Sequence, residues 1–173
     1  MPSAFAAGDD EVVEAERLIR DRMSGLDLDL LSLAAVSNVF RTATAVRNHM
    51  ERHALKPHSL SWSAFVVLFV LHIWGAKESR ELAAEAGISG GTLTGVLDTL
   101  ERKGLAVRQP VLTDRRRVGV ALTDAGTTVV EDVMPAFNRE EAQVTGDLTA
   151  EETATLARLL RIVLRTAEDL DNR

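Results

Sequence analysis

The chain has no cysteine. Disulfide bonds, zinc sites with cysteine ligands, thiol nucleophiles and cysteine-based redox switches are therefore excluded. Aromatic residues make up only 4% of the 173 residues, and tyrosine is absent. A surface that binds single-stranded nucleic acid by stacking many bases is for that reason not expected.

Long hydrophobic runs are also missing. The longest candidate, Phe65–Trp74, already contains His72 and is far shorter than the roughly 20 residues of a membrane-spanning helix. Residues 1–10 lack the basic start and the apolar core of a signal peptide. We therefore expect a cytoplasmic protein with no membrane partner.

Acidic residues outnumber basic ones overall, but positive charge is concentrated in one stretch. The net charge is −6, whereas residues 88–120 hold six basic and three acidic residues, a net of +3 that leaves −9 for the rest. The basic residues of this stretch are Arg102, Lys103, Arg108, Arg115, Arg116 and Arg117. A local basic segment in an acidic chain points to a local site for a negatively charged partner.

Helical periodicity dominates both ends of the chain. It predicts helices over Asp9–Met23, over Leu28–Leu55 before Pro57, and from a Ser61 cap to about Ile73. After residue 122, Thr123 is predicted to cap a helix that Pro135 kinks or interrupts. Thr149 is predicted to cap the last helix, with Glu152 completing a capping box.

The middle of the chain combines two short helices with two short strands. Ser79–Ala86 is a short helical segment, Gly87 supplies a turn, and Ser89 caps a helix that reaches about Lys103. Leu105–Gln109 and Val118–Leu122 read as strands joined by a polar connection that contains Asp114 and three arginines. This order is the pattern of a winged helix-turn-helix.

Such a unit suits double-stranded DNA, because a helix fits the major groove, where each base pair shows a distinct pattern of donors and acceptors. The outward face of the second helix is small and polar, and the hairpin arginines are placed to contact phosphates or the minor groove. The predicted DNA-binding residues are Ser89, Gly90, Gly91, Thr92, Thr94, Gly95, Asp98, Arg102, Asp114, Arg115, Arg116 and Arg117.

Two sequence blocks resemble the MarR family of bacterial regulators. The first runs through Leu82-Ala83, Ile88-Ser89, Leu93-Thr94, Leu97 and Leu100-Glu101-Arg102-Lys103-Gly104-Leu105 to Arg108. The second, Asp114–Gly126, fits that family's D-x-R and L-T-x-x-G pattern. The resemblance is close over Ser61–Gly126, and the order of the helices extends it to nearly the whole chain.

The resemblance implies a homodimer with interlocked terminal helices, one winged unit on each DNA half-site, and a wing in which Asp114 orients Arg116. Two features depart from the family: Gly95 stands where members often carry arginine, and the helix at Asp9–Met23 is shared by only some relatives. We expect this extra helix to add to the dimer or to cap a pocket.

We therefore predict a mainly α (α+β) fold that forms a single MarR-like domain over residues 1–173. Within it, residues 9–57 and 124–173 form dimerisation helices, and residues 58–123 form the winged helix-turn-helix lobe that binds DNA. The expected function is transcriptional regulation, most simply repression, at a pseudo-palindromic operator with half-sites about one helical turn apart.

Small aromatic or phenolic effectors bind some relatives between the dimerisation helices and the winged unit, so the resemblance also implies a ligand pocket. Its predicted lining combines aromatic residues with a polar one: Phe40, Thr44, Trp62, Val66 and Phe137. The aromatic residues among them are read as ordinary hydrophobic core by default.

Several polar residues have a structural reading beside the functional one. Arg102 and Lys103 suit a helix C-terminus as well as a phosphate contact, and Ser89 is an N-cap first. His49 and His53 are four residues apart on one helix but lack the H-E-x-x-H order, so solvated positions are favoured over a metal site.

An enzyme is not expected. The sequence has no G-x-S-x-G motif, no P-loop, no G-x-G-x-x-G motif and no metal triad, and no cofactor is implied. The alternative that stays open is a helical, dimeric protein-interaction module whose winged helix has lost DNA binding. The acidic total charge and Gly95 support that alternative.

Overall fold

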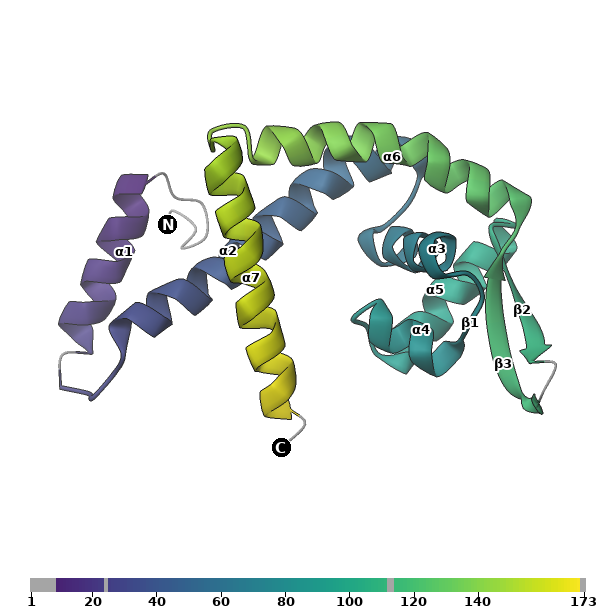
Figure 1. Cartoon of the computed structure of the whole chain (residues 1–173), viewed down its shortest axis with the longest axis horizontal. Coiled ribbons are helices and arrows are strands. Elements are labelled where there is room, and N and C mark those ends of the chain that lie inside the picture. The colour runs from purple at the N-terminus through teal and green to yellow at the C-terminus, as the bar shows by residue number, and fades with distance from the viewer. Residues whose placement is uncertain (1–8, 24, 112–113, 172–173) are drawn as a thin grey trace. The chain divides into compact units, whose positions relative to one another are not determined.

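The computed structural model describes residues 9–23, 25–111 and 114–171. Its contacts divide the chain into two compact units, Met1–His49 and Met50–Arg173, and Figure 1 shows the elements of each. No single helix among the described residues is long and apolar enough to cross a membrane. The boundaries predicted for the dimerisation and DNA-binding segments stay predictions.

The described part of the first unit holds two helices, α1 (Asp9–Arg22) and α2 (Leu30–Met50). The last residue of α2, Met50, already belongs to the second unit. Asp29 caps α2, because its carboxylate accepts hydrogen bonds from the backbone N–H groups of Leu31 and Ser32 at 3.1 and 3.0 Å. A bond from the Ser32 hydroxyl and these N–H groups lower the pKa of Asp29. The aspartate cap therefore stays charged at neutral pH.

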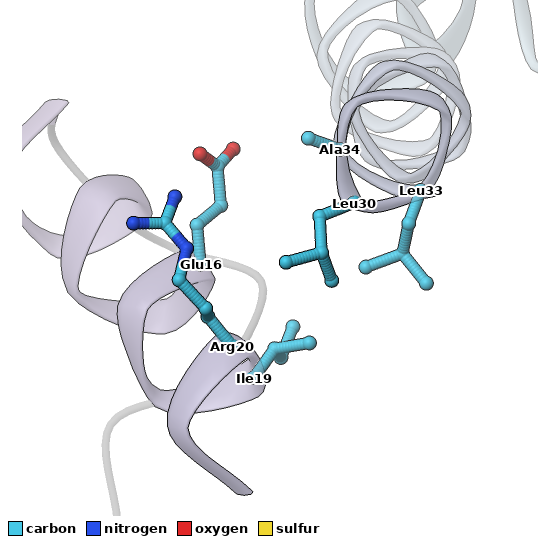
Figure 2. Close-up of a pocket in the computed structure, with 6 residues that line it drawn as sticks. All are labelled: Glu16, Ile19, Arg20, Leu30, Leu33 and Ala34. Atoms are coloured by element: carbon cyan, nitrogen blue, oxygen red, sulfur yellow. The ribbon is translucent and has the colours of Figure 1, made fainter. Parts of the chain in front are cut away.

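A small cavity lies between α1 and α2. Figure 2 shows the side chains of Ile19 from α1 and Leu30 from α2 pointing into the space between the helices. Its volume is about 30 Å³, whereas pockets for drug-sized ligands measure about 300–1,000 Å³. This cavity between the described side chains of α1 and α2 is thus far smaller than an effector, and the role expected for the extra N-terminal helix stays a prediction.

Two short, irregular helical turns stand at the start of the second unit. A π-helical turn (Glu51–Leu55) and a 3₁₀ turn (Lys56–His58) lead to α3 (Trp62–Trp74). Ser61 caps α3 as predicted, accepting from the backbone N–H of Ala64 at 3.3 Å. The carboxylate of Glu51 accepts from the backbone N–H of Trp62 at 2.9 Å. The side chains of Ser61 and Glu51 thus each pair one of the backbone N–H groups that have no partner within α3.

The winged helix-turn-helix follows. Strand β1 (Lys77–Glu78) precedes α4 (Ser79–Glu85) and α5 (Gly90–Arg102), and strands β2 (Ala106–Val111) and β3 (Asp114–Leu122) form the hairpin. The antiparallel sheet has the order β1-β3-β2, and Figure 1 shows α4 and α5 beside it. The predicted fold class, mainly helical with a winged helix-turn-helix, is confirmed.

Two details of the hairpin differ from the prediction. The segment that begins at Asp114 belongs to β3 and not to a polar connection, because backbone pairing continues to Val111 and Asp114 beyond the alternating apolar positions. The short strand β1 was not predicted, since two residues carry no periodic signal. It pairs with β3 through Lys77 and Val120, and Glu78 and Gly119.

The core of the second unit lies where its helices meet the sheet. Leu82 from α4 and Leu100 from α5 are fully buried, as are Val120 from β3 and Val130 and Val133 from α6 (Asp124–Val144). These buried side chains pack α5 and the β2–β3 hairpin against the same hydrophobic core. Both parts that are predicted to contact DNA are therefore held by the same core.

Helix α6 runs without a break through Pro135, so the alternative that this proline interrupts the helix is wrong. Proline removes only one backbone donor, and Val133 and Phe137 on either side of it are buried in the core. Packing on both sides thus outweighs the local cost of the proline.

The last helix, α7 (Ala150–Asp171), begins with the predicted capping box. The Glu152 carboxylate accepts from the Thr149 N–H at 2.8 Å, and the Glu152 N–H donates to the Thr149 hydroxyl at 3.3 Å. The bonds from Thr149 lower the pKa of Glu152.

Candidate nucleic-acid interface

Helix α5 is anchored by one apolar face and one cap. Leu93, Leu97 and Leu100 are buried against the core. Ser89 caps the helix as predicted, accepting from the backbone N–H of Thr92 at 3.1 Å, while the two hydroxyl groups lie 2.8 Å apart. The cap and the buried leucines fix the rotation of α5, so its other face is always the exposed one.

That exposed face carries the residues that the sequence assigned to the major groove, and all of them are exposed in the described second unit. They are Ser89, Gly90, Gly91, Thr92, Thr94, Gly95, Asp98 and Arg102. A Cβ atom built on Gly90 or Gly95 would meet nothing within 4 Å. The backbone of α5 is therefore open to close approach by another molecule.

Hydroxyl groups on this face are partly engaged by the helix itself. The hydroxyl of Thr94 donates to the carbonyl of Gly90 at 3.0 Å, and that of Thr99 donates to the carbonyl of Gly95 at 3.1 Å. Each hydroxyl keeps lone pairs as acceptors. Thr94 is thus oriented to accept a hydrogen bond from a base edge or a water molecule.

The sequence reasoning gave no role to Arg108, which the structure places at the centre of a polar cluster. Its guanidinium lies 2.8 Å from a carboxylate oxygen of Asp98, contacts the carboxylate of Glu101, and donates to the carbonyl of Thr94 at 3.3 Å. The backbone N–H of Arg108 also donates to Glu101 at 2.9 Å. Strand β2 is thereby tied to three positions along α5.

The basic residues at the end of α5 make protein contacts. The Lys103 ammonium donates to the carbonyl of Ser59 at 2.6 Å, where the chain turns in a left-handed conformation with φ 55°. The Arg102 guanidinium donates to the hydroxyl of Thr99 at 3.3 Å. Lys103 therefore has a structural role, while phosphate contact by either residue stays a prediction.

The wing residues Asp114, Arg115, Arg116 and Arg117 form the first part of β3. Their side chains lie outside the part of the chain whose side chains are described, so the predicted Asp114–Arg116 contact stays a prediction. Backbone pairing places these four residues at the end of the β2–β3 hairpin, next to residues 112–113. This position is the one expected for the wing.

The residues predicted to line an effector pocket fall in both units. In the second unit, the rings of Trp62 and Phe137 have centroids 6.2 Å apart, and those of Phe65 and Phe137 are 4.5 Å apart. In the first unit, the Thr44 hydroxyl donates to the carbonyl of Phe40 at 2.9 Å, and the Phe40 side chain is exposed. An aromatic cluster is present, and its use as a pocket wall stays a prediction.

Val66 completes the predicted lining from α3, where it is partly buried.

Within the described ranges, which contain His49 and His53, no group of three or more metal-ligating side chains occurs. A shallow groove of about 280 Å³ lies between α4 and α5, bordered by Leu93, Thr94 and Arg108 among others.

Comparison with known proteins agrees with this geometry. The MarR family model matches residues 60–118. An uncharacterised HTH-type transcriptional regulator of Bacillus subtilis (strain 168), YwaE, is 37% identical over 141 residues, which are 82% of this chain and 81% of that protein. The match thus extends well beyond the winged helix-turn-helix.

Two solved structures share the fold over three quarters or more of this chain. A cysteine-to-serine mutant of MarR from E. coli, complexed with operator DNA, has a TM-score of 0.72 and 28% identity, covering 80% of this chain and 99% of its own. Bordetella bronchiseptica BpsR, whose DNA binding is regulated by 6-hydroxynicotinic acid, has a TM-score of 0.69 and 25% identity, covering 75% of this chain and 97% of its own.

Proposed function

The chain belongs to the MarR family of DNA-binding transcriptional regulators, and from this membership we propose that it binds a pseudo-palindromic operator as a homodimer and represses transcription there. Helix α5 would read the major groove, and the β2–β3 wing would contact phosphates or the minor groove. The observation that carries the proposal is the exposed face of α5, small and open, on a helix fixed by Ser89 and Arg108.

The proposal is tested by selecting bound sequences from a random duplex library at about physiological salt. Enrichment of an inverted repeat supports a dimeric DNA reader and supplies the operator. A folded, dimeric protein that enriches no sequence would favour the alternative, a helical protein-interaction module with a degenerate winged helix. Repression is then tested by transcription in vitro from a promoter that contains the operator.

The homodimer is supported by an exposed apolar surface on α7, as far as the described residues show. Its large hydrophobic side chains are 42–61% exposed: Leu156, Leu159, Leu160, Ile162, Val163, Leu164 and Leu170. Contiguous apolar patches of this kind mark protein–protein interfaces. A second copy of the chain is the occupant that we propose, because an isologous dimer would bury this surface on both copies.

A Leu159→Glu substitution tests that interface. We expect the variant to sediment as a monomer at concentrations where the unchanged protein is a dimer, because a carboxylate buried between apolar helices costs several kcal/mol. Arg158→Glu changes the neighbouring, exposed residue to the same side chain and serves as the control. A dimeric Leu159→Glu variant would contradict the proposed interface.

We also propose that a small aromatic or phenolic effector releases the DNA, through a pocket walled by Trp62, Phe137 and their neighbours. The ring of Trp62 supports it, because it lies beside this cluster and is partly exposed, so it can stack on a flat aromatic ligand. The Trp74→Phe variant leaves Trp62 as the only tryptophan. Titration of this variant with phenolates should quench its fluorescence and weaken operator binding. If neither change is observed, the proposed pocket is contradicted.

A further inference from the structure

Arg108 is a cation on the unit that we propose to face DNA, yet its donors are engaged within the protein. Its guanidinium pairs with Asp98 at 2.8 Å and with Glu101, and it donates to the Thr94 carbonyl at 3.3 Å. Its side chain is 29% exposed, whereas that of Asp98 is 58% exposed. A guanidinium has five N–H donors in a fixed plane, and the three contacts use that fork against α5.

Because Arg108 belongs to β2, these contacts join the β2–β3 hairpin to α5. Arg108 pairs with Val120 in the β2–β3 ladder, and Val120 is fully buried. On the other side, Thr94, Asp98 and Glu101 span two turns of α5 along one line of the helix. One residue therefore joins the hairpin that carries the wing to the helix that carries the small, open face.

We propose that Arg108 is a positioning residue for sequence recognition: it holds α5 at a fixed orientation to the β2–β3 wing through Asp98 and Glu101, and it is not a phosphate contact. Asp98, in consequence, acts as the partner that orients Arg108 rather than as a reader of bases. This inference rests on the proposed function, because it concerns how the same DNA-binding surface is held. Operators are recognised when helix and wing reach the groove and the backbone together, so a loosened angle lowers specificity.

The experiment measures operator binding and random-duplex binding as a function of salt for Arg108→Gln, Asp98→Asn and the double variant. Arg139→Gln is the charge-matched control, since Arg139 is exposed on α6 outside the winged segment. For Arg108→Gln we expect about a tenfold or greater loss in the ratio of operator to random-duplex affinity. The slope of log K against log salt should stay unchanged within about half a unit, because no phosphate contact is removed.

The double variant separates a shared role from two independent ones. Because Asp98 and Arg108 act as one unit, the ratio for the double variant should be no lower than that for Arg108→Gln alone. The inference is overturned if Arg108→Gln lowers the slope by about one, reduces operator and random-duplex affinity equally, and adds to the effect of Asp98→Asn. That set of results would assign Arg108 to a phosphate.

Arg108→Lys keeps the inference testable if the glutamine variant does not fold. Lysine keeps the charge but cannot reach both carboxylates and the carbonyl from one planar group, so the ratio should still fall while the slope is kept. An Arg108→Lys variant with undiminished specificity would overturn the inference. If the unchanged protein shows no salt-dependent DNA binding, the proposed function itself fails, which is a different outcome from any change among the variants.

Discussion

Replacing Gly126 by alanine adds a single methyl group, yet it should lower the free energy of unfolding substantially. Gly126 is buried near the start of α6, and a Cβ atom there would lie 2.0 Å from the carbonyl oxygen of Leu105 and 3.2 Å from a methyl group of Leu122. Real Cβ atoms essentially never approach closer than 3.0 Å to such neighbours. Because the atom in the way is backbone, no side-chain rotation relieves the clash, and the two segments must part by about 1 Å.

The same separation strains the hydrogen bonds that join α6 to the end of α5. The backbone N–H of Thr123 donates to Leu105 at 3.2 Å, and the Thr123 hydroxyl donates to the carbonyl of Gly104 at 2.6 Å while accepting from the N–H of Gly126 at 3.0 Å. Overpacking costs about 1–3 kcal/mol, and each weakened bond about 1 kcal/mol. The gain in helix propensity from glycine to alanine offsets up to about 1 kcal/mol. We therefore expect a net loss of about 2–4 kcal/mol.

Urea unfolding followed by circular dichroism at 222 nm measures this loss, at one fixed protein concentration because a dimer's stability depends on it. Gly95→Ala is the matched control. Gly95 lies inside α5 with nothing within 4 Å of a built Cβ, so alanine should stabilise the protein by roughly 0.5–1 kcal/mol. A Gly126→Ala variant within about 0.5 kcal/mol of the unchanged protein would refute the reasoning.

Four further substitutions have expected results. Arg116→Ala should weaken binding to operator and random DNA alike and lower the slope of log K against log salt by about one. An undiminished affinity of this variant at physiological salt would exclude the wing contact. Thr94→Ala should instead change the preference between sequences. Gly95→Ala, although more stable, should bind the operator more weakly in a mobility-shift titration, because its methyl group fills the open face of α5. The pKa of Glu152 is lower when folded than when unfolded, so its contribution is present above the ordinary glutamate range and is lost as pH falls through the folded pKa. Glu152→Gln should therefore reduce the acid-induced loss of helicity between about pH 5 and pH 3, measured by circular dichroism.

The elements of this fold that the sequence predicted are those with local physical causes. Ser61, Ser89 and Thr123 each accept a hydrogen bond from the helix that follows, as their residue type and place before a periodic segment indicate. The capping box at Thr149 and Glu152 is equally local. Such features need only three or four residues of sequence to be recognised.

Features that depend on distant residues were not predictable in the same way. Glu51 reaches the start of α3 eleven residues later, at Trp62, because a π-helical turn and a 3₁₀ turn change the direction of the chain between them. The glycine of the L-T-x-x-G pattern was recognised only by resemblance. Its physical reason, the carbonyl of Leu105 at the site of a missing Cβ, exists only once α6 lies across the end of α5.

The charge of the winged segment shows how contacts alter what composition implies. Residues 88–120 carry a net of +3, but Arg108 pairs with both Asp98 and Glu101. These three residues together hold −1, which leaves +4 on the remaining charged residues of the segment. Three of those remaining cations are the wing arginines, Arg115 to Arg117. If the pairing persists on DNA, the carboxylates on α5 do not face phosphates as unpaired charges, and the acidic total of −6 does not oppose binding locally. The salt dependence of binding should then come mainly from the wing and the discrimination between sequences mainly from α5, two quantities that single substitutions in each element can measure separately.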